Sequence, residues 1–354
     1  MQVSSRYTLT IASIVAVTTL ALFNNCGQVK FSSTPNANQQ SPSAQGTTTP
    51  TTSNNGGGTT STPPPPVVCN PFGGGGSATS TEGLEANDVY YVDQSQIPPV
   101  QANDSSWSWN STYISNAIQN SVENLLNPVN IVTASGAPLI LSSAVNLFLP
   151  DINYPDMYFT QGFVNAANGQ ALQDASGNTL TSYFGFRLKS NFVAGNWAPG
   201  DYQIAILSDD GSILTMTGAA SDGSNFVIND DGFHSMQMAC SKQTIHVTAN
   251  SEFPLTFDYM QGPPITIGMI MLYRPVSVAG TAQDPLCGQG GGSDSYFFLD
   301  HNGSTPINPS EPQAPYLQLT GPFNPSTGSG GWTPVEANHF VLPSNNTNPC
   351  AGTD

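Results

Sequence analysis

The sequence has few basic residues and few charged residues of any kind. Its 354 residues include 6 Lys and Arg against 23 Asp and Glu, which gives a formal net charge of −17 at pH 7. Because nucleic-acid binding depends on cationic side chains that neutralise phosphates, this balance argues against a nucleic-acid partner. Charged residues make up 8% of the chain, whereas Gly and Pro number 34 and 29. This composition is typical of an extracellular β protein.

The sequence also lacks the common catalytic motifs. It contains no Gly-x-Ser-x-Gly, no His-Glu-x-x-His, no phosphate-binding glycine loop and no dinucleotide fingerprint. A carbohydrate-active enzyme would need two carboxylates at a defined separation, and in an acid-rich chain such a pair can always be found. We therefore expect a protein that is not an enzyme.

The amino terminus has the layout of a bacterial export signal. Arg6 precedes an apolar run over residues 11–23, which is too short to span a membrane comfortably, and Cys26 follows directly. Residues 20–27 resemble a lipoprotein lipobox, which implies cleavage after residue 25, lipidation of Cys26 and a membrane contact through the lipid alone. The residue after the cysteine, Gly27, is not an acid, and in this respect the chain resembles lipoproteins that are sent to the outer membrane. We expect a periplasmic or surface-exposed envelope protein; the alternative is ordinary secretion with a spare cysteine.

Residues 26–83 are predicted to be a disordered stalk. They are rich in Ser, Thr, Asn, Gly and Pro and include the run from Pro63 to Pro66. Such a segment cannot bury enough apolar surface to offset the entropy of the chain. It would hold a folded head, beginning near Leu84, away from the membrane.

The head is predicted to be all-β. Within residues 84–155, a single flanking helix is expected over 111–127, where apolar residues follow a helical period. Residues 156–275 are expected to form an antiparallel β-sandwich, because short strands follow one another with little helix between them. Residues 276–354 are expected to be an irregular tail that wraps the sandwich. The predicted strands are 89–92, 129–133, 139–149, 157–164, 183–189, 201–208, 212–217, 224–228, 244–247, 253–259 and 266–272.

The four remaining cysteines predict two disulfides. An even number in an exported chain is typical of an oxidising compartment, and no Cys-x-x-Cys arrangement suggests zinc or redox chemistry. Three connectivities are possible. Spacing favours Cys240 with Cys287, which leaves Cys69 with Cys350.

Two adjacent acids, Asp209 and Asp210, are the strongest functional signal. They follow the strand pattern of residues 202–207. Neighbouring carboxylates repel each other unless a cation or several hydrogen-bond donors compensate, so the pair suggests a calcium-type oxygen site. The alternative is that the pair caps a turn through bonds to its own backbone.

Five stretches of the chain together carry a family resemblance, and the segment Ser208-Asp209-Asp210-Gly211-Ser212 is the most specific of them. In order and spacing they resemble the PA-fourteen family, the insertion domain of anthrax protective antigen, whose relatives include flocculins and GLEYA adhesins. The resemblance implies that a cis peptide joins Asp209 and Asp210, that the pair holds calcium, and that calcium coordinates vicinal sugar hydroxyls. The stretches are 159–164, 183–188, 200–212, 253–259 and 267–274.

Later loops are expected to complete this site, because the family's further calcium ligands come from such loops. The oxygen-rich segment Asn229, Asp230 and Asp231 is the candidate for them. His234 could orient a ligand or sense pH, although a surface histidine without a role is the alternative. The aromatic residues that could face a sugar are Phe226, Phe233 and Tyr259.

These features together predict an adhesin-like surface lipoprotein that binds a glycan through calcium. The alternative is a structural surface protein that assembles with protein partners and in which any calcium only stiffens loops.

Overall fold

The computed structural model describes residues 64–72, 77–92, 121–127, 132, 136–158, 173–174, 177–262, 266–289, 319–343 and 346–352. All of them belong to one of two compact units, which comprises Pro63–Pro98 and Ser108–Asp354. The predicted leader, Cys26 and the stalk up to residue 63 lie outside the described residues, as do the first half of the predicted helix and most of the predicted strand 129–133. Within the described ranges, no helix combines the length and the apolar character needed to cross a membrane.

The described part of the chain is built mostly from strands. In chain order, its elements are β1 Val67–Cys69, β2 Leu84–Val92, α3 Val122–Leu126, β3 Ile140–Leu149, β4 Asn153–Tyr158, β5 Phe184–Val193, β6 Gly200–Asp209, β7 Ser212–Met216, β8 Phe226–Asp230, β9 Gln237–Cys240, β10 Ile245–Val247, β11 Glu252–Gln261, β12 Thr266–Pro275, α4 Val276–Ala279, β13 Thr333–Pro334, η2 Ala337–His339 and β14 Phe340–Val341.

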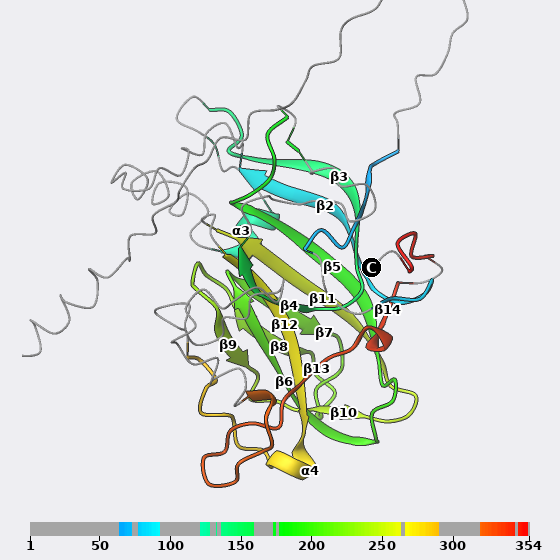
Figure 1. Cartoon of the computed structure of the whole chain (residues 1–354), viewed down its shortest axis with the longest axis vertical. Coiled ribbons are helices and arrows are strands. Elements are labelled where there is room, and N and C mark those ends of the chain that lie inside the picture. The colour runs from blue at the N-terminus through cyan, green and yellow to red at the C-terminus, as the bar shows by residue number, and fades with distance from the viewer. Residues whose placement is uncertain are drawn as a thin grey trace, which may run out of the picture. The chain divides into compact units, whose positions relative to one another are not determined.

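These strands form two sheets, which confirms the predicted all-β sandwich. Among the described strands, the first sheet has the order β1-β3-β2-β5-β11-β7-β8, and β14 adds to β5. The second has the order β10-β6-β12-β13, with β4 on β12 and β9 on β6. Pairing is antiparallel except between β1 and β3. Figure 1 shows β3, β2, β5 and β11 side by side in this order.

The main core lies between the two sheets. Strand β6 is apolar on both faces because each face packs against a different hydrophobic cluster. Ile204 and Ile206 point into the main core, whereas Ala205 and Leu207 belong to a second cluster with Trp332. The carboxy-terminal segment therefore covers the outer face of the second sheet, and almost all of β6 is buried. A strand buried on both sides reads as a continuous apolar run.

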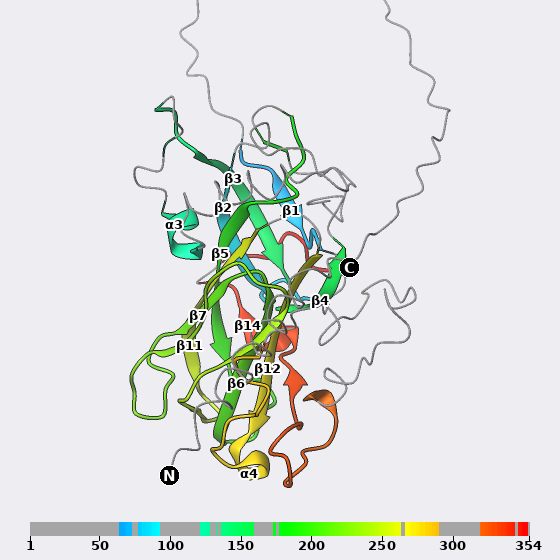
Figure 2. The ribbon, with the colours of Figure 1, turned by 90° about the vertical axis from the view of Figure 1, so that its left-hand side faces the viewer.

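Helix α3 covers the first sheet from outside, as the carboxy-terminal segment covers the second. Helix α3 packs through Val122, Leu125 and Leu126 against Ile140 and Met260 on the first sheet. In Figure 2, α3 and the orange and red carboxy-terminal segment lie on opposite sides of the sheets.

The boundaries of the head differ from those predicted. Residues 67–69, which the sequence places in the stalk, form β1 and pair with β3, so order begins before Leu84. The tail is also less irregular than expected, because β13 and β14 extend both sheets. Such short strands contain too few residues to show a periodic pattern of apolar side chains in the sequence. The predicted disulfides are confirmed: Cys69 bonds Cys350, and Cys240 bonds Cys287.

Candidate functional site

The paired acids lie where the chain passes from one sheet to the other. Asp209 ends β6 in the second sheet, and Ser212 begins β7 in the first. The connection therefore crosses the edge of the sandwich and is not the tip of a hairpin. Asp209 and Asp210 are only 4% and 5% exposed. The peptide bond between them is cis.

Glycines allow this crossing to pack against a second loop. A Cβ on Gly211 would lie 2.6 Å from the carbonyl oxygen of Gly232, so the two backbones approach too closely for a side chain. A Cβ on Gly262 would lie 2.8 Å from Asp210 Oδ2. The site is therefore assembled from the turn at 210–211, the loop after β8 and the end of β11.

Backbone amides hold the carboxylate of Asp210. The backbone N–H of His234 donates to Oδ1 at 2.8 Å, and that of Gly262 donates to Oδ2 at 2.6 Å. Burial nevertheless raises the pKa of Asp210 from 3.8 to about 7, and these hydrogen bonds and the nearby His234 offset only part of that effect. The negative charge at this position is thus under-compensated. Gly262 was not among the predicted site residues; it follows directly on β11, the strand that neighbours β7.

Asp230 brings a third buried carboxylate into the same loop assembly. It is 5% exposed, and its Oδ2 accepts a hydrogen bond from Ser208 Oγ at 2.9 Å. Gln237 Nε2 donates to its Oδ1. Burial raises the pKa of Asp230, while His234, whose Nε2 lies 3.8 Å from Oδ2, acts in the opposite direction.

The structure gives Asp231 and Asn229 other partners. Asp231 accepts hydrogen bonds from Ser121 Oγ at 2.8 Å and from the backbone N–H of Val122 at 2.7 Å, so it caps the amino-terminal end of α3. Asn229 Oδ1 accepts from the backbone N–H of Asp231 at 3.0 Å. The side chain of Asp231 therefore binds α3, and that of Asn229 stabilises its own turn.

The aromatic candidates do not form an exposed sugar-facing surface. Phe226 is fully buried in the main core, at the opposite end of β8 from Asp230, so its predicted role in ligand binding is wrong. Tyr259 is also fully buried, and its single hydroxyl hydrogen lies within hydrogen-bond reach of two acceptors, the backbone oxygen of Asp209 and Gln261 Oε1. Tyr259 therefore supports the site from within. Phe233 is half-buried and packs edge-on against Tyr183, with ring centroids 5.8 Å apart.

His234 contacts the acids instead of standing free on the surface. Its Nε2 lies 3.0 Å from the backbone oxygen of Asp230, and its backbone N–H donates to Asp210. This placement agrees with a positioning role rather than with a surface histidine without a role.

The chemistry of the site suits a hard cation. Three buried carboxylates, those of Asp209, Asp210 and Asp230, lie at or beside the crossing, and burial raises the pKa of Asp210 and of Asp230. In the described part of the chain, no three His, Cys, Asp or Glu side chains converge as a ready-made metal site. Calcium accepts backbone carbonyls, amide oxygens and water beside carboxylates, and oxygen donors of this kind surround the crossing.

No protein-family model and no curated protein matches the sequence. Solved PA14 domains are among the structures that this chain resembles. The PA14 domain of the antifreeze protein MpAFP is 14% identical, and the match covers 62% of this chain and 87% of that one with a TM-score of 0.31. The A domain of Epithelial Adhesin 9 from Candida glabrata, solved with Galβ1-3GlcNAc, is 12% identical over 68% of this chain and 98% of its own, with a TM-score of 0.28.

An anti-sigma factor domain-containing protein also matches, with 14% identity and a TM-score of 0.25, over 39% of this chain and 38% of its own. These matches carry no conclusion about what this chain binds, so a function must be argued from the residues of the site itself.

Proposed function

We propose that this chain is an adhesin-like carbohydrate-binding protein of a bacterial envelope, anchored through a lipid on Cys26, and that it binds glycan through calcium at Asp209 and Asp210. The observation that carries the calcium site is the burial of two adjacent carboxylates, 4% and 5% exposed, beside a third buried carboxylate, that of Asp230. A buried charge without a counter-ion is costly, and a bound cation removes that cost.

Each residue of the site then has a defined task. The carboxylates of Asp209 and Asp210 would hold the ion, and Asp230 would contribute the third negative charge. The backbone amides of Gly262 and His234 fix the orientation of Asp210. Tyr259 holds the backbone of Asp209 from below. Calcium, when bound, supplies coordination positions that vicinal hydroxyls of a sugar can occupy.

The second candidate is a structural surface protein in which calcium stiffens these loops and the partners are proteins. One observation favours it: Phe226 and Tyr259 are fully buried, so neither offers a face on which a sugar could stack. The proposal therefore relies on hydroxyl coordination more than on stacking.

Calorimetric titration separates the two candidates. The chain of residues 27–354, which retains all four disulfide cysteines, is titrated with calcium and then with a panel of neutral and acidic glycans. Asp209→Asn tests the site, and Asp222→Asn is the matched control, because it removes the same charge from an exposed turn after β7. We expect Asp209→Asn to weaken calcium binding by about tenfold or more, because affinity follows ligand charge.

Each pattern of results has one meaning. Glycan binding that needs calcium and is lost in Asp209→Asn supports the proposal. Calcium binding without any glycan supports the structural candidate. Equal calcium binding by wild type and Asp209→Asn would show that the paired acids do not hold the ion.

A further inference from the structure

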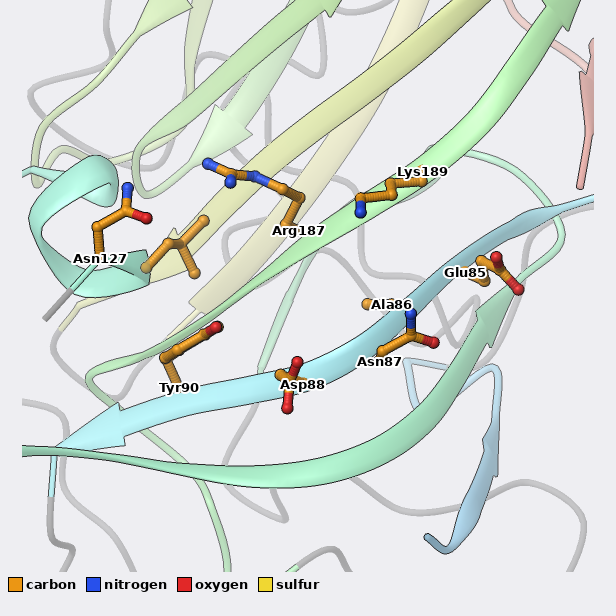
Figure 3. Close-up of a pocket in the computed structure, with 9 residues that line it drawn as sticks. Glu85, Ala86, Asn87, Asp88, Tyr90, Asn127, Arg187 and Lys189 are labelled. Atoms are coloured by element: carbon orange, nitrogen blue, oxygen red, sulfur yellow. The ribbon is translucent and has the colours of Figure 1, made fainter. Parts of the chain in front are cut away.

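A polar cavity lies on the outer face of the first sheet, and none of its lining residues belongs to the site of the paired acids. It has a volume of about 170 Å³ and lies between β2, β5 and the end of α3. Figure 3 shows Arg187 and Lys189 standing on β5, Asn87 and Tyr90 on β2, and Asn127 after α3.

The register of β2 shifts at the residues that line this cavity. The register between β2 and β5 is interrupted between Glu85 and Val89, and the register between β2 and β3 shifts between Ala86 and Asp88. Asn87 consequently has no register partner in either neighbouring strand, and its side chain is exposed. Bulges commonly redirect side chains at binding sites.

The cavity contains donors that the fold does not use. Arg187 donates Nε and Nη2 to the carboxylate of Asp258, both at 2.7 Å, which leaves its Nη1 unused by that pair. The Lys189 ammonium makes no hydrogen bond or ion pair with any described residue, although Glu85 is its cross-strand neighbour. The Glu85 carboxylate instead accepts from Asn346 Nδ2, at 2.8 Å to each oxygen. Two of the few cations in this acidic chain thus lie side by side on β5, and among the described residues only Arg187 has an ion-pair partner.

The charges around the cavity define the class of ligand. Among the lining residues, Arg187 and Lys189 balance Glu85 and Asp88, so the cavity carries no net charge that would attract an ion of either sign. The remaining choice is a neutral ligand that both donates and accepts hydrogen bonds. Its partners would be the amides of Asn87 and Asn127, the hydroxyl of Tyr90 and the carboxylate of Asp88.

The size of the cavity narrows the class further. Pockets for drug-sized ligands measure roughly 300–1,000 Å³, so about 170 Å³ accommodates one small ring and not an oligomer. A ring that carries several hydroxyls and no charge is a neutral pyranose.

We propose that the groove formed by Asn87, Asp88, Tyr90, Arg187 and Lys189 is a second saccharide site, which takes one neutral pyranose ring by direct hydrogen bonds and without a metal ion. It shares none of these residues with the site at Asp209 and Asp210. Failure of this proposal therefore leaves the calcium site standing, and the reverse also holds.

The test uses residues 27–354 in buffer with EDTA, observed by saturation-transfer and chemical-shift NMR. The probes are methyl α-glucoside, methyl α-mannoside, methyl β-galactoside and N-acetylglucosamine, with N-acetylneuraminic acid as the anionic probe. We expect at least one neutral probe to bind with a dissociation constant on the order of millimolar, as befits a ligand this small. The anionic probe should bind more weakly.

Lys189→Ala should weaken this binding by about tenfold, because a charged donor is lost. Lys242→Ala is the matched control, since it removes an exposed lysine outside the groove. Asp209→Asn should leave binding in EDTA unchanged. Arg187 is left in place because its pair with Asp258 joins β5 to β11.

Three outcomes would overturn the proposal. They are no binding of any neutral probe in EDTA, a preference for the anionic probe, and an equal loss of binding in Lys189→Ala and Lys242→Ala.

Discussion

Replacing Arg274 with Met should destabilise the head by about 3–5 kcal/mol, the usual effect of removing one partner of a buried ion pair. Arg274 is fully buried on β12 and pairs with Asp284, whose Oδ2 lies 3.2 Å from Nη1. Its Nε donates to Gln203 Oε1 at 2.8 Å, and its guanidinium lies 4.5 Å from the ring centroid of Trp332. Carbonyl oxygens of the carboxy-terminal segment accept its remaining donors, at 3.1–3.2 Å.

The magnitude follows from what the substitution leaves behind. Met fills most of the aliphatic volume, so little cavity forms. Asp284 keeps its hydrogen bonds from Leu286, Gly330 and Trp332 but loses its only ion-pair partner among the described residues. Hydrogen bonds to carbonyls at positions 282, 328 and 330 are lost at the same time. A loss of 3–5 kcal/mol should lower the melting temperature by roughly 6–20 °C, at about 2–4 °C per kcal/mol for a domain of this size.

Denaturant unfolding monitored by circular dichroism measures the free energy, and hydrogen exchange locates the loss. Faster exchange is expected at Gly331 and Trp332, whose amides bond Gly321 and Leu319 in the segment that Arg274 holds. Lys242→Met is the matched control, because an exposed cation without such contacts should change stability by less than about 0.5 kcal/mol. If Arg274→Met unfolds within about 1 kcal/mol of wild type, the buried pair does not hold the tail and the reasoning is refuted.

Three further predictions concern the acidic site. In EDTA, the free energy of unfolding should fall as pH rises from about 4 to about 7. The pKa of Asp210 is raised to about 7 in the folded state, so the folded protein retains a proton that the unfolded chain releases. Melting temperatures across this range should fall less steeply in Asp210→Asn, and an unchanged slope would contradict the assignment. Asp231→Ala should lower stability by about 0.5–2 kcal/mol through loss of the cap on α3, as measured by urea unfolding, and unaltered stability would show that the cap contributes nothing. Gly211→Ala should lower the free energy of unfolding by about 1–3 kcal/mol through overpacking against Gly232. It should also weaken calcium binding in the same calorimetric assay, and a wild-type affinity would show that the close approach of the two backbones is not needed.

Local sequence signals were sufficient for the individual strands and for the paired acids. Val, Ile, Leu and aromatic residues between turn residues located most strands to within a few residues, as in the predicted 253–259 and the observed β11. Periodicity could not locate β1, β9 or the short strands of the tail. Each is at most four residues long and pairs with a distant strand, so its formation depends on the partner.

The composition of the candidate site was only partly predictable. Asp210, Asp230 and His234 come together as the sequence suggested. Asp231 is adjacent to Asp230, yet it binds α3, more than 100 residues earlier in the chain. Phe226 and Asp230 share the buried face of β8 but lie at its opposite ends, and nothing within that short segment indicates which end of the strand lies at the site.

By itself the sequence determined the class of the fold, the expectation of two disulfides and the position of the adjacent acids, because turn residues, apolar runs and an even number of cysteines are read locally; it favoured one of three disulfide connectivities, and the structure decided for it. Only the tertiary structure decided that β6 and β7 belong to different sheets, that the acids between them are buried, and that the tail covers β6 through Arg274 and Trp332. Burial and pairing depend on contacts between segments that are distant in sequence, and those contacts set both the charge balance at Asp210 and the opening of the groove beside Lys189.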